Sequence, residues 1–167
     1  MEIRLERGTG DAIRRHAAEA YPEECCGAML GRAGAGGKSV TRTLRIENAR
    51  TDSARNRFLV TDRDYLRVEA QAAADGLDLI GFYHSHPDHP ARPSRYDLEH
   101  AFPVFSYVIV SVAGGLPDRM TSWVLAEDRE RFRPEPVRVA PGDPAGPAVA
   151  PLDPPRQPHP PSRGARP

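Results

Sequence analysis

The placement of proline limits where this chain can fold. Twelve of its 18 prolines lie in residues 134–167, and six lie in the first 133 residues. The stretch 141–167 also has few large apolar side chains, so it cannot bury enough surface to offset the entropy lost on folding. We therefore predict a disordered, proline-rich tail over residues 141–167. The predicted folded domain covers residues 1–140, a length that suits a single hydrophobic core.

The charge of the chain is balanced, with 23 basic and 23 acidic residues, so its net charge favours neither nucleic acid nor an acidic membrane as a partner. No apolar run reaches the roughly 18 residues of a membrane helix, and the first residues lack the apolar stretch of a signal peptide. The adjacent Cys25 and Cys26 cannot form a disulfide framework, and we expect them to be small core residues on opposite faces of a strand. These features predict a cytoplasmic protein that binds no nucleic acid and no membrane.

Helical spacing of apolar residues, together with the residues that start and stop helices, predicts two main helices and a short third one. They cover residues 10–20, 62–75 and 94–101. The second helix follows a capping-box pattern at Thr61 and Asp64, and the short third helix begins at Ser94.

Alternating or continuous apolar runs predict six or seven strands. They cover residues 24–31, 39–47, 77–84, 104–112 and 121–126, with short strands at 57–60 and 136–140. The glycine-rich segment 32–38 is predicted as the loop of a hairpin, 114–118 as a turn, and 87–93 as a loop because it holds three prolines. We therefore predict an α/β (α+β) domain with one mixed, mostly antiparallel sheet flanked by helices, in which 104–112 is a central strand.

The segment GFYHSHPDHPARPSRYDLEHA, residues 81–101, carries the residues with chemistry. His84 and His86 are two positions apart at a strand end, so both imidazoles project from the same side. Asp97 follows eleven residues after His86, in the first turn of the short helix, and the proline-rich loop can fold that helix back toward the strand end. Two histidines and one aspartate supply three ligands to Zn²⁺ and leave a fourth position for water, as a hydrolytic site requires.

A hydrolytic metal site also needs a base. Glu23 and Glu24 are both candidates, because a carboxylate at the start of the first predicted strand can face the metal while the apolar residues after it enter the sheet. The position of the two glutamates alone does not choose between them.

Each of these pieces also has an ordinary explanation. Two histidines in one strand are common as buried or surface residues, a lone glutamate is usually solvated, and Ser94 with Asp97 forms a plain capping box. His89 and His100 are candidates for groups that support the metal ligands, but they are explained more simply as loop and helix-surface residues. The residue types, their order and their spacing together favour the metal site, since one oxygen of Asp97 can reach a metal while the residue still caps its helix.

Two other metal sites fit part of the pattern. His84-x-His86-x-Asp88-His89 matches the HxHxDH motif of metallo-β-lactamases, but that fold needs further downstream ligands and a longer two-sheet domain. Two histidines and one carboxylate can also hold Fe(II) for oxygenase chemistry. A glutamate base beside the metal favours hydrolysis over this oxygenase chemistry.

The whole arrangement resembles the JAMM (MPN+) metallopeptidase motif, HxH, seven residues, Ser, two residues and Asp, preceded by a glutamate in an early strand. The corresponding residues here are His84, His86, Ser94 and Asp97. The segment YPEECCGAMLG resembles the strand with the catalytic glutamate, which lies three residues before a glycine, and this selects Glu24 over Glu23. The likeness covers about residues 12–112.

The resemblance implies the fold of that family, a single domain similar to the cytidine-deaminase sandwich, with one Zn²⁺ per chain. It implies that His84, His86 and Asp97 bind the zinc. It implies that Glu24 takes a proton from the attacking water and later delivers it to the leaving amine. Ser94 would donate a hydrogen bond to the oxyanion of the tetrahedral intermediate.

The resemblance also implies a substrate class. The short chain is similar to small prokaryotic members, which hydrolyse a peptide or isopeptide bond after the C-terminal Gly-Gly of a small ubiquitin-like or sulfur-carrier protein. The ECCG strand and the compact size are most similar to members that release cysteine, or a short extension, from a sulfur carrier in cysteine biosynthesis. The alternatives are a non-catalytic binding or scaffold module of the same fold, and another zinc hydrolase that acts on small amides.

Overall fold

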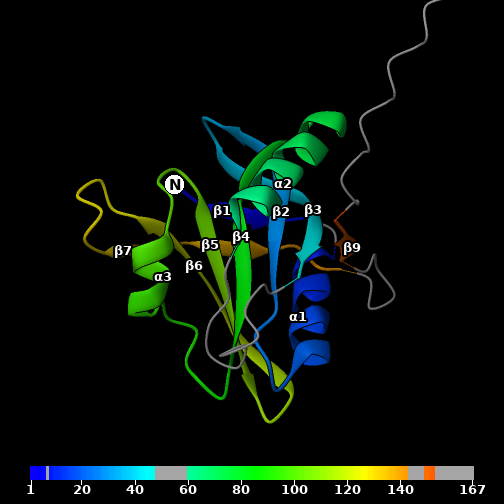
Figure 1. Cartoon of the computed structure of the whole chain (residues 1–167), viewed down its shortest axis with the longest axis vertical. Coiled ribbons are helices and arrows are strands. Elements are labelled where there is room, and N and C mark those ends of the chain that lie inside the picture. The colour runs from blue at the N-terminus through cyan, green and yellow to red at the C-terminus, as the bar shows by residue number, and fades with distance from the viewer. Residues whose placement is uncertain (7, 48–59, 143–148, 153–167) are drawn as a thin grey trace, which may run out of the picture.

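The computed structural model describes residues 1–6, 8–47, 60–142 and 149–152 (Figure 1). The helices in this part of the chain are α1 (Thr9–Ala20), α2 (Asp62–Ala74) and α3 (Arg95–His100). The strands are β1 (Ile3–Leu5), β2 (Cys26–Gly34), β3 (Gly37–Ile46), β4 (Asp78–Pro87), β5 (Ser106–Ala113), β6 (Leu116–Leu125), β7 (Phe132–Glu135), β8 (Val137–Val139) and β9 (Ala150–Pro151). The two main helices and the short third one are therefore present as predicted.

All the described strands belong to one sheet. Its order is β7-β6-β5-β4-β2-β3-β1-β8, with β9 beside β3. The ladders of β2 with β3 and of β5 with β6 are antiparallel, whereas β4 and β5 are parallel, so the predicted mixed sheet is confirmed. Because β4 and β5 run in the same direction, the chain between them must cross back along the sheet, and α3 lies in this crossover. The crossover brings the start of α3 back to the end of β4.

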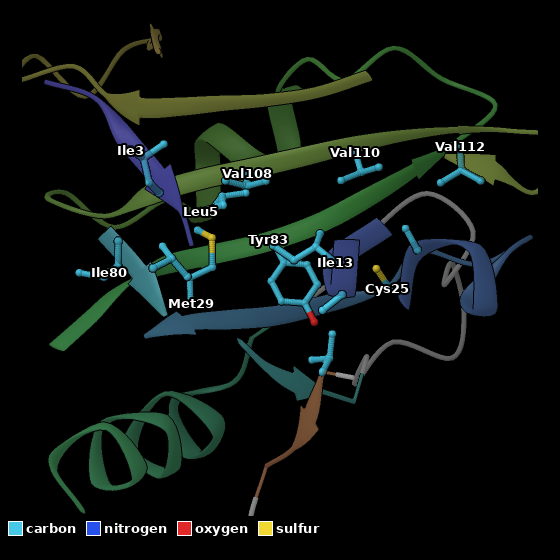
Figure 2. Packing of buried hydrophobic residues seen from close by; sticks show 14 residues of the cluster. Ile3, Leu5, Ile13, Cys25, Met29, Ile80, Tyr83, Val108, Val110 and Val112 are labelled. Carbon is cyan, nitrogen blue, oxygen red and sulfur yellow. The ribbon is translucent and has the colours of Figure 1, made fainter. Parts of the chain in front are cut away.

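The two faces of the sheet carry separate apolar clusters. On one face, Ile13 of α1 packs with residues of β1 to β5, and Figure 2 shows this cluster around Tyr83. On the other face, Val68 of α2 packs with residues that include Phe82. Adjacent residues of β4 thus point to opposite faces of the sheet. Burial of each large apolar side chain in these clusters stabilises the folded state by roughly 1.5–3 kcal/mol. The two clusters fix β4 between α1 and α2.

Gly27 makes room for the largest side chain of the first cluster. Tyr83 is fully buried, and its hydroxyl oxygen lies 2.8 Å from Nδ1 of His16 in α1. A methyl group at Gly27 would overlap both the Leu44 carbonyl oxygen and the Tyr83 ring. A glycine at position 27 is therefore needed for the Tyr83 side chain to pack at this point of the sheet.

The structure corrects several predicted boundaries. β2 begins at Cys26 and continues to Gly34, so most of the predicted loop 32–38 belongs to the strands of the hairpin. Likewise, β6 begins inside the predicted turn 114–118, of which Gly114 and Gly115 have the positive φ angles of a turn. Both hairpins are tighter than predicted, because glycine and proline at an exposed strand end can still pair with a partner strand.

Two short strands depend on partners that sequence periodicity does not show. β1 was not predicted, because three residues are too few for a pattern; it pairs with both β3 and β8. The predicted strand 136–140 is observed as β8, at one end of the sheet. Of the predicted strand 57–60, residues 57–59 lie outside the described residues.

The predicted domain boundary at residue 140 also needs correction. Val149 is buried in the first apolar cluster, and Leu152 packs against the second. Between them β9 pairs with β3, beyond the three residues of β3 that β1 covers. This short apolar stretch inside the proline-rich segment finds an open length of strand edge, where proline is tolerated. Residues 143–148 and 153–167 of the predicted tail lie outside the described residues.

No helix in the parts of the chain that the structure describes is long and apolar enough to cross a membrane.

Candidate metal centre

The end of β4 carries the two histidines. His84 and His86 alternate with Tyr83 and Ser85, so they lie on the same face of the sheet as Phe82. Phe82 packs in the apolar cluster below α2, and the histidines continue its row beyond that cluster. Their Nε2 atoms are 3.0 Å apart, so both imidazoles project from the same side, as predicted.

Pairing between β2 and β4 places Glu24 beside this row. Cys26 is the first residue of β2 in the antiparallel ladder with β4. The pairing continues one residue further, since the Ser85 N–H donates to the Cys25 carbonyl oxygen at 3.1 Å and the Cys25 N–H donates to Ser85 Oγ at 2.9 Å. In the same register, the next residue, Glu24, comes opposite His86.

Asp97 reaches the histidines from the start of α3. Its N–H donates to Ser94 Oγ at 3.1 Å, and its Oδ2 accepts from the Ser94 N–H at 2.6 Å, which completes a capping box. Its Oδ1 lies 3.5 Å from Nε2 of His84, and its Oδ2 lies 3.8 Å from Nε2 of His86. The carboxylate therefore caps the helix and faces both histidines at once.

These three side chains fit one metal ion. The ligand atoms of His84, His86 and Asp97 all lie within 4.8 Å of one another. Donors on a four-coordinate Zn²⁺, with bonds of about 2.0–2.1 Å, lie roughly 3.4 Å apart. The observed separations of 3.0, 3.5 and 3.8 Å bracket that value, so the set suits a single ion of this size.

The protonation of the set also fits a cation. Burial and the neighbouring His84 lower the pKa of His86 to about 4, so its ring is neutral near pH 7. His86 Nδ1 lies 2.9 Å from the Pro90 carbonyl oxygen, which can only accept, so Nδ1 carries the proton and Nε2 presents a lone pair. Burial acts to raise the pKa of Asp97, but His84 and hydrogen bonds from Ser94 hold it well below its usual range. A lone pair and a carboxylate that face each other are stabilised by a metal ion between them.

Glu24 lies beside this set, in a hollow of about 330 Å³ that it shares with His86 and Ser94. The Glu24 side chain is buried, and burial raises the pKa of its carboxyl to about 7. A carboxylate with a pKa near neutrality can accept a proton and return it, which is what a general base and acid requires. Glu23, the other candidate from the sequence, is exposed.

The family of the chain follows from comparison with known proteins. The family model described as prokaryotic homologues of the JAB domain matches residues 7–126, which is more than half of the chain. The chain belongs to this JAB-domain family. The matched region contains Glu24, Ser94 and the three residues of the candidate metal centre.

Two named relatives and one solved structure agree with this assignment. The chain is 35% identical over 135 residues to a desampylase from Haloferax volcanii, which covers 77% of this chain and 92% of the relative. It is 31% identical over 114 residues to a protein from Thermus thermophilus named as a TtuB-protein conjugate cleaving protease, which covers 68% of this chain and 73% of the relative. A JAB1/MPN domain protein from Archaeoglobus fulgidus has the same fold, with a TM-score of 0.51 at 20% identity over 84% of this chain and 97% of that one.

In this JAB-domain protein, Ser94 caps α3 and also lines the hollow beside Glu24. Its hydroxyl oxygen accepts the Asp97 N–H, so its own proton remains for another acceptor. Ser94 is exposed and lines the same hollow as Glu24. The sequence-predicted residues Glu24, His84, His86, Ser94 and Asp97 are thus all brought to one place.

The two cysteines of the JAB-domain protein point away from each other. Cys25 belongs to the apolar cluster under α1 and Cys26 to the cluster under α2, as predicted. Burial raises the pKa of both thiols, that of Cys25 to about 12, so both stay protonated and unreactive near pH 7. Neither takes part in the candidate centre.

The hollow of the JAB-domain protein also has residues that sequence reasoning did not assign to the site. His89 and Arg92, from the loop after β4, line the hollow together with Glu24. The sequence explains His89 most simply as a loop residue and assigns no role to Arg92. Both lie within eight residues of a histidine ligand, in a proline-rich loop that must remain near the end of β4, and for Arg92 that proximity is the signal the sequence offers. His100 lies on the exposed side of α3, as predicted.

Proposed function

We propose that this chain is a zinc-dependent metallopeptidase. In this proposal it hydrolyses the peptide or isopeptide bond after the C-terminal Gly-Gly of a small ubiquitin-like or sulfur-carrier protein. The observation that carries the proposal is the meeting of His84, His86 and Asp97 beside a buried glutamate with a pKa near 7. The names of two relatives, a desampylase and a conjugate cleaving protease, support an action on ubiquitin-like proteins. The two cysteines are free thiols, which fits the reducing cytoplasm that we propose as its location.

The metal is held by His84, His86 and Asp97 in this mechanism. A zinc ion there supplies Lewis-acid chemistry, because it makes water ionisable near neutral pH and polarises a carbonyl group. The hydrogen bond from His86 Nδ1 to the Pro90 carbonyl oxygen keeps the ring turned with Nε2 toward the centre. The capping box holds Asp97 in the same way.

Glu24 moves the proton of the reaction. Its carboxylate takes a proton from the attacking water as the water oxygen bonds to the carbonyl carbon of the substrate. Glu24 then gives that proton to the amine nitrogen as the carbon–nitrogen bond breaks, so that one carboxylic acid and one amine leave. The burial that raises the pKa of Glu24 to about 7 makes both transfers accessible near neutral pH.

Ser94 stabilises the oxyanion of the tetrahedral intermediate. Its hydroxyl proton is directed by a cap in which Oγ is the acceptor, so the donor is available to the substrate oxygen. A Gly-Gly sequence suits this arrangement, since glycine lets the substrate backbone approach buried groups such as Glu24 and His86 closely. Release of a single cysteine from a sulfur carrier is the narrowest form of the proposal.

The experiment compares two adjacent glutamates. The zinc-loaded chain is incubated with a small ubiquitin-like carrier that ends in Gly-Gly, either extended by one residue or joined to a lysine side chain. We expect Glu24→Gln to lower kcat/KM by about 10²–10⁴-fold, because general acid–base catalysis is lost. The matched control, Glu23→Gln, alters an exposed residue and keeps wild-type activity.

Two results would contradict the proposal. Wild-type activity in Glu24→Gln would remove this residue as the base. Failure of the zinc-loaded wild-type chain to cleave either kind of Gly-Gly substrate, while it cleaves small amides, would replace the substrate class with a different zinc hydrolase activity.

A further inference from the structure

The hollow beside the metal centre contains a single strong positive charge. Among the described residues that line it, Arg92 is the one arginine or lysine, and Glu24 supplies a carboxylate to the same hollow. Arg92 is exposed, and no acidic side chain of the described residues lies within ion-pair distance of its guanidinium group. Its charge is therefore available to a molecule that enters the hollow, because the described residues supply no acidic partner for it.

The loop that carries Arg92 is firmly attached to the sheet. The Asp88 N–H donates to the Val112 carbonyl oxygen at 2.7 Å, and Thr121 Oγ1 donates to the Ala91 carbonyl oxygen at 2.7 Å. The Arg92 N–H donates to the Pro90 carbonyl oxygen at 2.8 Å. These bonds fix the backbone from which the Arg92 side chain extends, so its position beside the hollow is part of the fold.

The charge of Arg92 complements one kind of leaving group. When the residue after the cleaved bond is the last of the substrate, its α-carboxyl carbon lies only about 2.5 Å from the amine nitrogen. That amine must come within hydrogen-bond reach of Glu24, so the carboxylate must enter the same hollow. The Glu24 carboxylate there, with Asp97 close to it, disfavours a further negative charge. A lysine side chain released from an isopeptide bond carries no carboxylate at that point.

We propose that Arg92 binds the α-carboxylate of the leaving residue and so selects substrates in which a single C-terminal residue follows the cleaved bond. This inference rests on the proposed peptidase function and adds its specificity. A guanidinium group suits this role because its planar donors match the two oxygens of a carboxylate.

The test uses two substrates that differ only in that carboxylate. A Gly-Gly carrier is extended by one residue that ends either in the free acid or in a carboxamide. We expect the wild-type enzyme to cleave the free acid about tenfold better, the size of one charge-assisted contact in a partly solvated site. Arg92→Gln is expected to remove this preference by slowing cleavage of the free acid alone. The control, Arg95→Gln, changes an exposed arginine that pairs with Glu99 on α3 and keeps the preference.

Binding gives a readout apart from turnover. In the Glu24→Gln enzyme, the free acid is expected to bind about tenfold more tightly than the carboxamide, and Arg92→Gln in that background is expected to equalise the two Kd values.

The outcomes separate this inference from the proposed function. Equal cleavage of acid and carboxamide by the wild-type enzyme overturns the inference and leaves the function standing. An equal loss on both substrates in Arg92→Gln also overturns it, because the residue would then only support the loop. Absence of cleavage of both substrates and of an isopeptide conjugate overturns the proposed function and the inference with it.

Discussion

Two helices of this protein begin with the same local pattern, a hydroxyl residue followed three positions later by aspartate. At α2 the Asp64 N–H donates to Thr61 Oγ1 at 3.2 Å, and at α3 the Asp97 N–H donates to Ser94 Oγ at 3.1 Å. The surroundings of the two carboxylates differ. Asp64 accepts from the Thr61 hydroxyl and pairs with Arg67 at 3.3 Å. Asp97 instead faces two histidine nitrogens from β4.

The difference shows that a cap motif sets the geometry of a helix start and not its chemistry. The chemistry comes from what the sheet places opposite the cap. Asp64 has a partner three residues away on its own helix, whereas the partners of Asp97 come from a strand that ends before the intervening loop. The pattern of a hydroxyl residue followed by aspartate therefore indicates a helix cap by itself. It indicates a metal site only together with the histidines of the neighbouring strand.

Buried histidines repeat this contrast. Burial lowers the pKa values of both His16 and His86 to about 4, so both rings are neutral near pH 7. His16 is hydrogen-bonded to the Tyr83 hydroxyl on the α1 face of the sheet, so each of these two buried polar groups has the other as its partner. His86 presents a lone pair to another histidine and a carboxylate. The lowered pKa that His16 and His86 share is caused by burial. The hydrogen-bond partners of each ring, and not its pKa, distinguish the structural histidine from the candidate metal ligand.

The largest expected difference between the two caps is in metal binding. Asp97→Asn keeps an oxygen for the cap but loses the charge of a ligand, and we expect zinc affinity to fall by about 100-fold or more. Asp64→Asn makes the same change at the other cap and is expected to leave zinc affinity unchanged. Competition with a chromophoric chelator measures both. Equal affinities for Asp97→Asn and the wild type would mean that Asp97 only caps α3.

The hydroxyl residues of the two caps are expected to differ next in activity. Ser94→Ala removes a donor to the oxyanion, so we expect kcat/KM on a Gly-Gly substrate to fall by about 100-fold. Thr61→Ala removes only a cap and is expected to retain wild-type activity. Ser94→Thr restores the hydroxyl and should recover most of the loss. If Ser94→Ala and Thr61→Ala have the same kcat/KM, Ser94 is no part of the reaction.

This contrast also explains how much the sequence could predict. The three helices and most long strands follow local periodicity, and the spacing of His84 and His86 predicts their shared side without reference to the rest of the chain. Glu24 could be chosen over Glu23 only through the family resemblance, because its position depends on the register between β2 and β4. Periodicity within one segment contains no information about register between two segments.

What the sequence could not predict depends on distant pairing. β1 and β9 are two or three residues long, and each exists because β3 offers it an edge. Val149 looks like part of a proline-rich tail until its burial in the α1-face cluster is seen. Arg92 belongs to no motif that the sequence shows, and it lines the hollow because its loop is attached to β5 and β6.

The contrast between the two histidines can be tested by acid unfolding of the metal-free protein. The pKa of His16 is lowered from 6.5 to about 4 by burial and then by Arg45, so its contribution to stability is complete above pH 6.5 and is lost as the pH falls toward 4. Between pH 6.5 and about pH 4, His16 is protonated in the unfolded chain but neutral in the folded one. From pH 7 to pH 5 the wild type is expected to lose about 2 kcal/mol more of its free energy of unfolding than His16→Gln does, as measured in urea. Parallel curves for the two proteins would show that His16 does not stay neutral.

The smallest expected effect is one that the two caps share. In the metal-free protein, Ser94→Ala and Thr61→Ala each leave a backbone N–H at a helix start without its hydroxyl acceptor, and each is expected to lower the free energy of unfolding by about 1 kcal/mol. Urea unfolding without zinc measures both on one scale. A cost for Ser94→Ala near zero would mean that the short α3 is held by its loop rather than by its cap. If Ser94→Ala and Thr61→Ala lower the free energy of unfolding equally but differ in kcat/KM, the two roles of Ser94 are separated. The cap would then contribute the same stability at both helices, and the reaction would depend on the histidines that only the Ser94 cap faces.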